Sequence, residues 1–174
     1  KVPDTLWSVT GGGSNMLGIS YAFLDEKTEI FAIERAGKGI ETGQHAATIT
    51  SNSPTAILLG ARASAIMNED GQISESTTEA SGLDFSRVGP EVTYLAKTGR
   101  IQFRATKDID AQKTFQMMTR KVGILPAIEP CFMIHAALEE IKKRKKTSQN
   151  HLLHLCGSGE SNVARQLQFK KDNE

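Results

Sequence analysis

The pattern of apolar and polar positions predicts a strand, a helix and a second strand within the first 35 residues. Residues 5–9 are rich in β-forming side chains, and a glycine-rich segment, residues 10–15, follows them directly. Residues 16–23 mix apolar and small side chains without proline, as a buried helix does, and residues 29–34 predict a buried strand. Strand, glycine turn, helix and strand form one βαβ unit, and such units build parallel sheets.

From about residue 35 to residue 92 the periodic pattern stops. Glycines recur along this segment, and serine and threonine cluster at residues 48–55 and 74–81. Regular structure is expected only at residues 56–59 and 62–67. A long loop-rich insertion in a compact domain is usually functional, so we expect this one to serve a site.

A strand and a helix are predicted after the insertion. Residues 101–106 predict the strand, and Asp108 is a candidate N-cap for the helix that follows it. Gly123 is placed to end this helix. Four apolar residues fall near one face of it and predict its buried side: Ile109, Phe115, Met118 and Val122.

A second helix and a last strand complete the pattern. Pro130 suits the first position of the helix, whose half-buried face is predicted by the i, i+3, i+4, i+7 spacing of apolar residues. The basic run 142–146 follows, and cations in a last turn complement the helix dipole, which favours a solvated helix end over a binding patch. Residues 152–156 predict the strand. The apolar residues of the helix face are Ile134, Ala137, Leu138 and Ile141.

The expected fold class is therefore α/β: a parallel twisted sheet with flanking helices, plus the loop-rich insertion. The chain has 174 residues, of which 21 are Lys or Arg and 20 are Asp or Glu, for a net charge of +1. This balance gives no reason to expect nucleic acid. No stretch approaches the roughly 18 apolar residues of a membrane span. Two cysteines form no disulfide framework, which favours a reducing compartment, and a start at Lys1 without Met suggests part of a longer chain.

The glycine-rich segment is the first candidate for chemistry. Backbone N–H groups that converge at a helix N-terminus bind phosphate, and glycine lets the backbone approach the anion closely. The position of this segment between a strand and a helix favours that interpretation, and a plain tight turn is the alternative. The candidate residues are Gly11, Gly12, Gly13, Ser14 and Asn15.

Two common phosphate motifs do not match. A P-loop needs Gly-Lys-Ser/Thr, and Gly18 is followed by Ile19. The dinucleotide motif needs a third glycine or alanine where this chain has Met16. Glu34 does imitate the ribose-binding acid about 20 residues on. A nucleotide-binding α/β module therefore stays as an alternative function.

Metal and acid candidates are few. Cys131 and His135 lie four residues apart, and His151 and His154 lie near Cys156, but structural zinc normally needs four converging ligands. It is simpler to interpret these histidines and cysteines as ordinary buried or surface side chains than as metal ligands. Glu129 is an acid at a loop-to-helix boundary, where it could also serve as an N-terminal charge on the helix dipole.

Six segments occur in an order that closely resembles the C-terminal part of the tryptophan synthase β chain, a fold-type II pyridoxal-phosphate enzyme. The family's N-terminal part carries its Schiff-base lysine in a His-Lys-x-Asn motif, which residues 1–174 do not contain. By this resemblance residues 1–174 are the C-terminal, cofactor-phosphate-binding domain without the N-terminal domain, and residues 35–92 are its mobile communication region. The segments are residues 9–15, 39–45, 70–73, 82–90, 123–129 and 156–159.

The resemblance implies a lyase of tryptophan biosynthesis that uses pyridoxal 5'-phosphate to make L-tryptophan from L-serine and indole. It implies that residues 11–15 hold the cofactor phosphate, that Glu129 and Cys156 face the cofactor ring, and that Asp84 belongs to the mobile region that closes over the substrate. It also implies an α-chain partner, a second β chain and a cytoplasmic location. A monovalent cation is expected on the backbone carbonyls of Gly11, Phe85 and Arg87.

Several positions depart from the family pattern. Cys156 replaces a serine, and Ser158 and Ser161 replace an arginine and a lysine. Val92 stands where histidine is common, and residues 58–59 are leucines where aromatic residues are common. A truncated or degenerate, non-catalytic relative is therefore a second alternative. We expect the 174-residue chain alone to be inactive.

Overall fold

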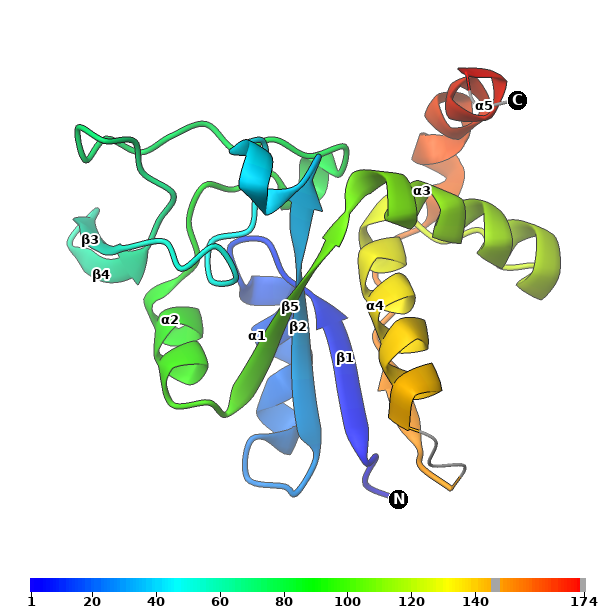
Figure 1. The fold of residues 1–174 in the computed structure, drawn as a ribbon. Coiled ribbons are helices and arrows are strands. Elements are labelled where there is room, and N and C mark those ends of the chain that lie inside the picture. Colours follow the sequence, from blue (N-terminus) through cyan, green and yellow to red (C-terminus); the bar gives the residue numbers. More distant parts are fainter. Residues whose placement is uncertain (145–147, 173–174) are drawn as a thin grey trace.

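A four-stranded parallel sheet forms the centre of the molecule. A computed structural model describes residues 1–144 and 148–172, and Figure 1 shows its ribbon. The strand order is β5-β2-β1-β6, and each neighbouring pair is parallel. The predicted α/β class is confirmed. The strands are β1 (Thr5–Val9), β2 (Glu29–Gly37), β5 (Ile101–Lys107) and β6 (His151–Leu153), and the last ends before Cys156.

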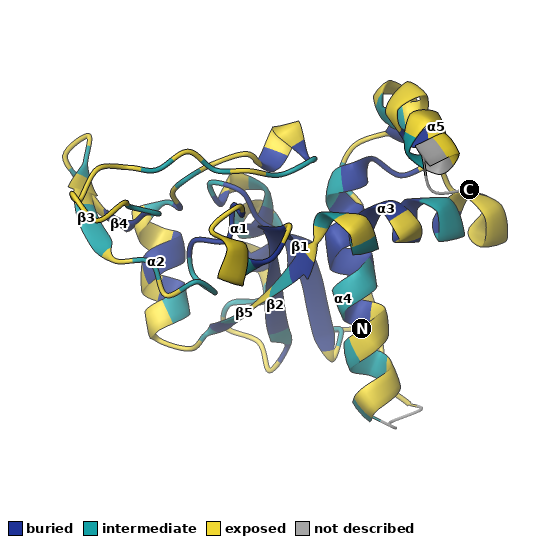
Figure 2. Ribbon diagram, turned by 45° about the horizontal axis from the view of Figure 1, so that its top comes forward, coloured by how far each residue is buried: buried dark blue, intermediate teal, exposed yellow. Residues whose placement is uncertain are grey.

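Helices cover both faces of this sheet. Helices α1 (Ser14–Ser20) and α2 (Pro90–Lys97) pack on one face, and α3 (Asp108–Met117) and α4 (Ile128–Arg144) pack on the other. Successive strand side chains point to opposite faces, so Leu6 joins the first core and Trp7 the second. Figure 2 shows the central strands as the most deeply buried part.

The α3 prediction is partly wrong. Asp108 is the first helical residue instead of the N-cap, and its carboxylate accepts hydrogen bonds from the Thr78 hydroxyl (3.0 Å) and the Glu79 N–H (2.7 Å). Phe115 and Met118 are buried as expected, but Ile109 and Val122 are exposed. A π-helical turn, Met118–Val122, follows α3 and shifts the angular spacing, so Val122 leaves the buried face. Gly123 ends this turn in the left-handed conformation.

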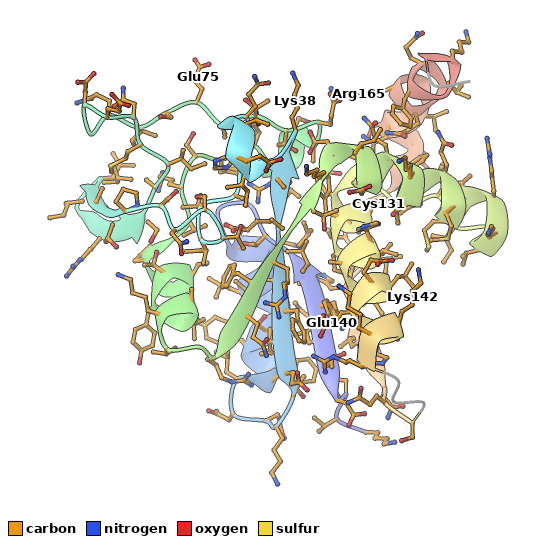
Figure 3. The ribbon with its side chains drawn as sticks, in the orientation of Figure 1. Lys38, Glu75, Cys131, Glu140, Lys142 and Arg165 are labelled. Carbon is orange, nitrogen blue, oxygen red and sulfur yellow. The ribbon has the colours of Figure 1, made fainter. Side chains whose placement is uncertain are left out.

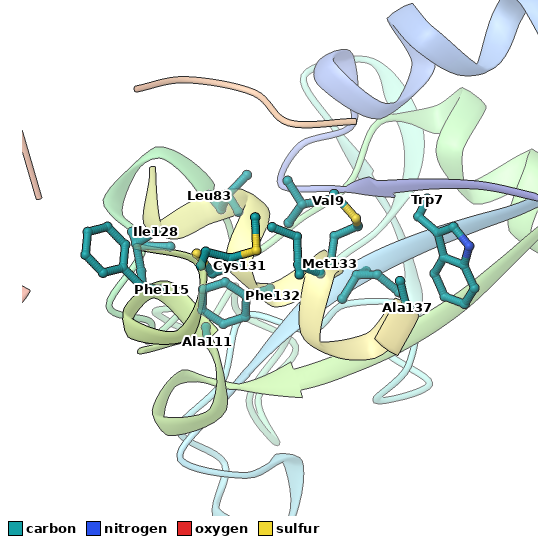
Figure 4. Close-up of a cluster of buried hydrophobic side chains, with 14 of the residues drawn as sticks. Trp7, Val9, Leu83, Ala111, Phe115, Ile128, Cys131, Phe132, Met133 and Ala137 are labelled. Carbon is teal, nitrogen blue, oxygen red and sulfur yellow. The ribbon is translucent and has the colours of Figure 1, made fainter. Parts of the chain in front are cut away.

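Helix α4 buries a wider arc than the predicted stripe. It starts at Ile128, so Pro130 is its third residue, still within the first turn where a missing N–H costs nothing. Ile134 and Ala137 are buried as predicted, whereas Leu138 is 37% exposed. The helix packs against the sheet and α3 together (Figure 4), which buries three further side chains: Cys131, Phe132 and Met133.

The end of α4 combines solvated and paired cations. Lys142 and Lys143 are exposed, as predicted for the basic run, and Lys142 points away from the helix in Figure 3. Lys142 forms an exposed ion pair with Glu139 (3.0 Å). Arg144 is half-buried, forms a bidentate ion pair with Glu29 (2.9 and 3.0 Å) and lies over the Phe31 ring. Residues 145 and 146 of the run lie outside the described residues.

Between β2 and α2 the chain holds one antiparallel hairpin, β3 (Thr55–Leu58) with β4 (Ala61–Ser64), and two short 3₁₀ turns, Ile40–Thr42 and Ser81–Leu83. The sequence pattern did not indicate α2 or the C-terminal helix α5 (Val163–Asp172). Within the described residues, every helix is too short or too polar to cross a membrane.

The buried Phe132 and the partly exposed Leu138 of α4 should contribute differently to the stability of the protein. We expect Phe132→Ala to lower the free energy of unfolding by about 3–5 kcal/mol, since it leaves a cavity between the sheet and α3. Leu138→Ala on the same helix should cost about 1 kcal/mol. Urea unfolding followed by circular dichroism measures both. Equal losses of unfolding free energy in the two variants would contradict the assignment of Phe132 to the buried face of α4.

Candidate functional site

A cavity of about 420 Å³ opens beyond the C-terminal ends of β1 and β6, where ligands bind in parallel sheets. Its walls come from the start of α1, the Ser81–Leu83 turn, the start of α4 and the segment after β6. Segments far apart in the sequence therefore meet at one site. The lining residues are Asn15, Ser81, Gly82, Leu83, Ala127, Glu129, Cys156, Gly157, Ser158, Ser161 and Asn162.

The glycine segment is the predicted strand-to-helix turn, between Val9 of β1 and Ser14 of α1. Gly13 has φ = 123°, which side-chain-bearing residues rarely adopt, and a methyl group there would collide with Val92. The Gly12 carbonyl accepts the Gly89 N–H at 2.8 Å, so the turn is fixed to the start of α2. Convergence of its N–H groups on an anion stays a prediction.

Asn15, Glu129 and Cys156, which the resemblance assigns to one site, line the same cavity. Glu129 lies in the first turn of α4, and a methyl group on Gly82 would be 3.0 Å from its Oε1 atom. The Asn15 side chain donates a hydrogen bond to the Val9 carbonyl and forms another hydrogen bond with the Cys156 thiol. Burial raises the pKa of the Cys156 thiol, against the effect of the Asn15 hydrogen bond. The thiol is therefore neutral at pH 7.

Other predicted site residues lie outside the lining of this cavity. Asp84 is exposed and accepts a hydrogen bond from the Ser76 hydroxyl at 2.6 Å, one residue beyond Leu83 of the cavity wall. Phe85 packs its ring on Gly11, and Arg87 is exposed and bridges to Ala65. The structure thus brings three of the predicted side chains together. Residues 11–14 are adjacent to one of them, Asn15.

Some residues of the site carried no clear signal in the sequence. The Asn162 side chain accepts the Ile128 N–H at 3.2 Å and so fixes the start of α4. Ser81 belongs to the serine and threonine cluster at 74–81, whose position on a cavity wall only the fold reveals. Residues 76–83, here called the strap, end in the Ser81–Leu83 turn on this wall. Arg165 of α5 holds it through the Glu79 carbonyl (2.8 Å) and carboxylate.

The departures from the family pattern have different surroundings. Ser158 and Ser161 line the cavity. Val92 is fully buried against Gly13. The Leu58–Leu59 pair lies at the turn of the β3–β4 hairpin, away from the lining residues, and Leu59 is 92% exposed.

Glu34 cannot serve as the ribose-binding acid of a nucleotide site. Its buried carboxylate accepts the backbone N–H groups of residues 48–50 at 2.8–3.1 Å, and the Thr50 hydroxyl as well. A nucleotide hydroxyl would have to displace these bonds. The nucleotide-binding alternative therefore loses the acid on which it depended.

The histidine and cysteine candidates form hydrogen bonds and core contacts. His151 and His154 pair with the hydroxyls of Thr5 (2.7 Å) and Ser8 (3.1 Å). Cys131 is fully buried, and burial raises the pKa of its thiol to about 12. Among residues 1–144 and 148–172, no group of three or more His, Cys, Asp or Glu side chains could hold a metal ion.

The comparison with known proteins supports the resemblance. The chain is 36% identical over 166 residues to the tryptophan synthase β chain of Allorhizobium ampelinum, a match that covers 94% of this chain. The chain spans 40% of that relative's length. No protein-family model matches the chain. The predicted resemblance to the tryptophan synthase β chain is confirmed.

The two thiols should differ in reactivity. We expect iodoacetamide to alkylate Cys156, which borders the cavity, and to leave buried Cys131 unmodified in the folded protein. The rate at Cys156 should rise up to a pH above 9, the ordinary thiol pKa, because burial disfavours the thiolate. Peptide mass spectrometry across a pH series measures both, with Cys156→Ser as the control. Alkylation of both thiols at one rate would contradict the assignment.

Proposed function

We propose that this chain is the C-terminal, cofactor-phosphate-binding part of a tryptophan synthase β-type lyase, which uses pyridoxal 5'-phosphate to make L-tryptophan from L-serine and indole. The observation that carries the proposal is the meeting of Asn15, Glu129 and Cys156 in one cavity beside the glycine turn. The similarity to a tryptophan synthase β chain over nearly the whole chain supports it.

The residues of the cavity fit this cofactor. A volume of about 420 Å³ lies within the usual range of small-molecule sites, roughly 300–1,000 Å³. The glycine turn before α1 offers backbone N–H groups to an anionic phosphate. The neutral Cys156 thiol can contact a pyridine nitrogen without protonating it, although it is a weaker hydrogen-bond partner than a hydroxyl.

When bound, pyridoxal phosphate would supply an electron sink for bond breaking on the amino-acid substrate. The chain's own residues would orient the cofactor and exclude water. In this proposal residues 11–15 hold the phosphate, Cys156 faces the ring, and Glu129 provides a carboxylate that can hold a proton at Oε1 across the cavity. The Ser81–Leu83 turn shields this space, and Asp84 joins the site when the region 35–92 closes.

The proposal extends to partners. An α chain and a second β chain would associate with the complete enzyme in the cytoplasm, and the Schiff-base lysine would come from chain outside residues 1–174. The expected mobility of residues 35–92 is part of the same proposal.

A second candidate is a non-catalytic relative. Ser158 and Ser161 line the cavity at positions where the resembled family carries basic residues, so this wall lacks two positive charges. Such a protein would still bind the cofactor phosphate but would not turn over substrate. Complementation of a strain that lacks tryptophan synthase β, by the gene in its natural reading frame, separates the two candidates.

Phosphate recognition by the glycine turn can be tested with a pair of ligands. We expect the chain to bind pyridoxal phosphate more tightly than pyridoxal, because only the former carries the phosphate. Gly13→Ala should lower the affinity for pyridoxal phosphate about tenfold or more and leave the affinity for pyridoxal unchanged. The reason is that a positive φ costs an alanine about 1–3 kcal/mol and that the added methyl group would collide with Val92. Fluorescence titration measures both affinities.

Gly18→Ala is the matched control, because a methyl group there meets nothing within 4 Å. This variant should keep the affinity for both ligands. If Gly13→Ala keeps a native circular dichroism spectrum but loses affinity for pyridoxal and pyridoxal phosphate equally, the result would argue against a phosphate site.

Tryptophan formation by the isolated chain is expected to be absent. None of the described lining residues is a lysine, and Lys27, Lys38 and Lys97 are exposed. A solvated lysine stays protonated at neutral pH and is a poor imine former. The assay mixes the chain with pyridoxal phosphate, L-serine and indole. Tryptophan made faster than by the free cofactor, and lost on changing one lysine, would show that this chain carries the catalytic base.

A further inference from the structure

A second cavity, of about 280 Å³, lies between the C-terminal half of α3, the π-helical turn after it and α5. Helix α5 packs beside α3 and lies above it in Figure 1. Leu125, Val163 and Leu167 line this cavity and are exposed to solvent, whereas Phe115 forms a buried part of its wall. The two helices therefore leave an apolar space between them that a ligand can enter.

The wall of this cavity contains a buried polar atom without a partner. Gln166 of α5 lines the cavity and is only 5% exposed. Its Oε1 atom is buried and accepts no hydrogen bond from any residue that the structure describes. A buried carbonyl oxygen without a donor is unfavourable, and a bound molecule that donates a hydrogen bond to it would remove this cost. A ligand of this cavity is therefore expected to carry an N–H or O–H group.

The other groups of the wall favour an aromatic ligand. The Thr119 hydroxyl already donates a hydrogen bond to the Phe115 carbonyl (2.9 Å), which leaves the Gln166 oxygen as the acceptor that needs a donor. A flat ring can pack against the Phe115 ring, and the Arg120 guanidinium on the same wall is attracted to the face of an aromatic ring. The volume lies just below the usual range of ligand sites, roughly 300–1,000 Å³, which suits a ligand smaller than a typical drug.

We propose that this cavity is a second binding site, which takes a small aromatic molecule with one N–H or O–H donor. The donor bonds the Gln166 side chain, and the ring packs between α3 and α5. The site is separate from the cavity beside Glu129 but lies close to it along the chain, since Leu125 lines the second cavity and Ala127 lines the first. Neither the Gln166 acceptor nor the apolar walls depend on the proposed function.

Indole and 1-methylindole are the probes, because they share a ring system and only indole has an N–H group. Proton–nitrogen correlation NMR spectra of the chain without cofactor follow both titrations. We expect indole to shift the signals of residues 115–125 and 163–167 saturably, and to bind there about tenfold more tightly than 1-methylindole, since only indole satisfies the buried oxygen. Gln166→Leu, which keeps the bulk and removes the acceptor, should abolish this tenfold difference.

A pair of phenylalanine variants tests the position of the site. Val163→Phe should fill the cavity and weaken the binding of both probes. Val122→Phe is the matched control, because Val122 is exposed at the end of the π-helical turn and lies outside the lining residues. This variant should keep the native affinity for both probes.

The native chain alone can overturn the inference, even if Gln166→Leu or Val163→Phe does not fold. Equal affinity for the two probes would overturn it, as would the absence of a saturable shift up to the solubility limit of indole, which would leave only water at Gln166. Shifts confined to the cavity beside Glu129 would also contradict it. Signals of residues 115–125 and 163–167 that respond to protein concentration instead of indole would indicate a second copy of the chain as the occupant. Failure of the proposed function appears elsewhere, as native protein that does not discriminate pyridoxal phosphate from pyridoxal.

Discussion

Parallel pairing of β1 with β2 is the constraint on which the site depends. The register sets Val9 opposite Ile33, so β1 ends beside the second half of β2, which continues to Gly37 in the same direction. From there β1 leads into the glycine turn, and β2 leads into the segment that returns as the Ser81–Leu83 turn. A one-residue slip would reverse which side chains reach each core and would move both segments.

Neighbouring buried charges at the end of β2 use backbone groups instead of opposite charges. Following the alternation of β2, Glu34 points to the face of α1 and α2 and collects the N–H groups of residues 48–50. Arg35 points to the face of α3 and α4 and donates to the Thr10 carbonyl. Each charge thus orders a stretch of loop that has little apolar surface of its own. A hydrophobic pair at these positions could pack but could not order those loops.

Local sequence patterns predicted the sheet well because each central strand is buried on both faces and is therefore strongly apolar. The glycine turn followed from the same logic, since parallel strands deliver their ends to one edge. The site roles of Glu129 and Cys156 came from the resemblance, and Glu129 lies in the first turn of α4 instead of at the end of a strand. The patterns failed where tertiary contacts decide: Val122 leaves its face through a π-helical turn, and Phe132 is buried because α4 packs on the sheet and α3 together. The burial of Arg35 had no local signal, since a lone arginine at the end of a strand is usually solvated.

The strap formed by residues 76–83 joins the cavity to the end of the chain. Its hold on α5 is a carbonyl bond and a partly exposed ion pair between Arg165 and Glu79, and such pairs contribute only about 0.2–1 kcal/mol. The strap is held more firmly on its other side, where Thr78 and Glu79 donate hydrogen bonds to Asp108 and where Ala80 and Leu83 are buried in the core. Loss of the Arg165–Glu79 contact would therefore release α5 before the strap, and this wall of the cavity would stay attached to the start of α3.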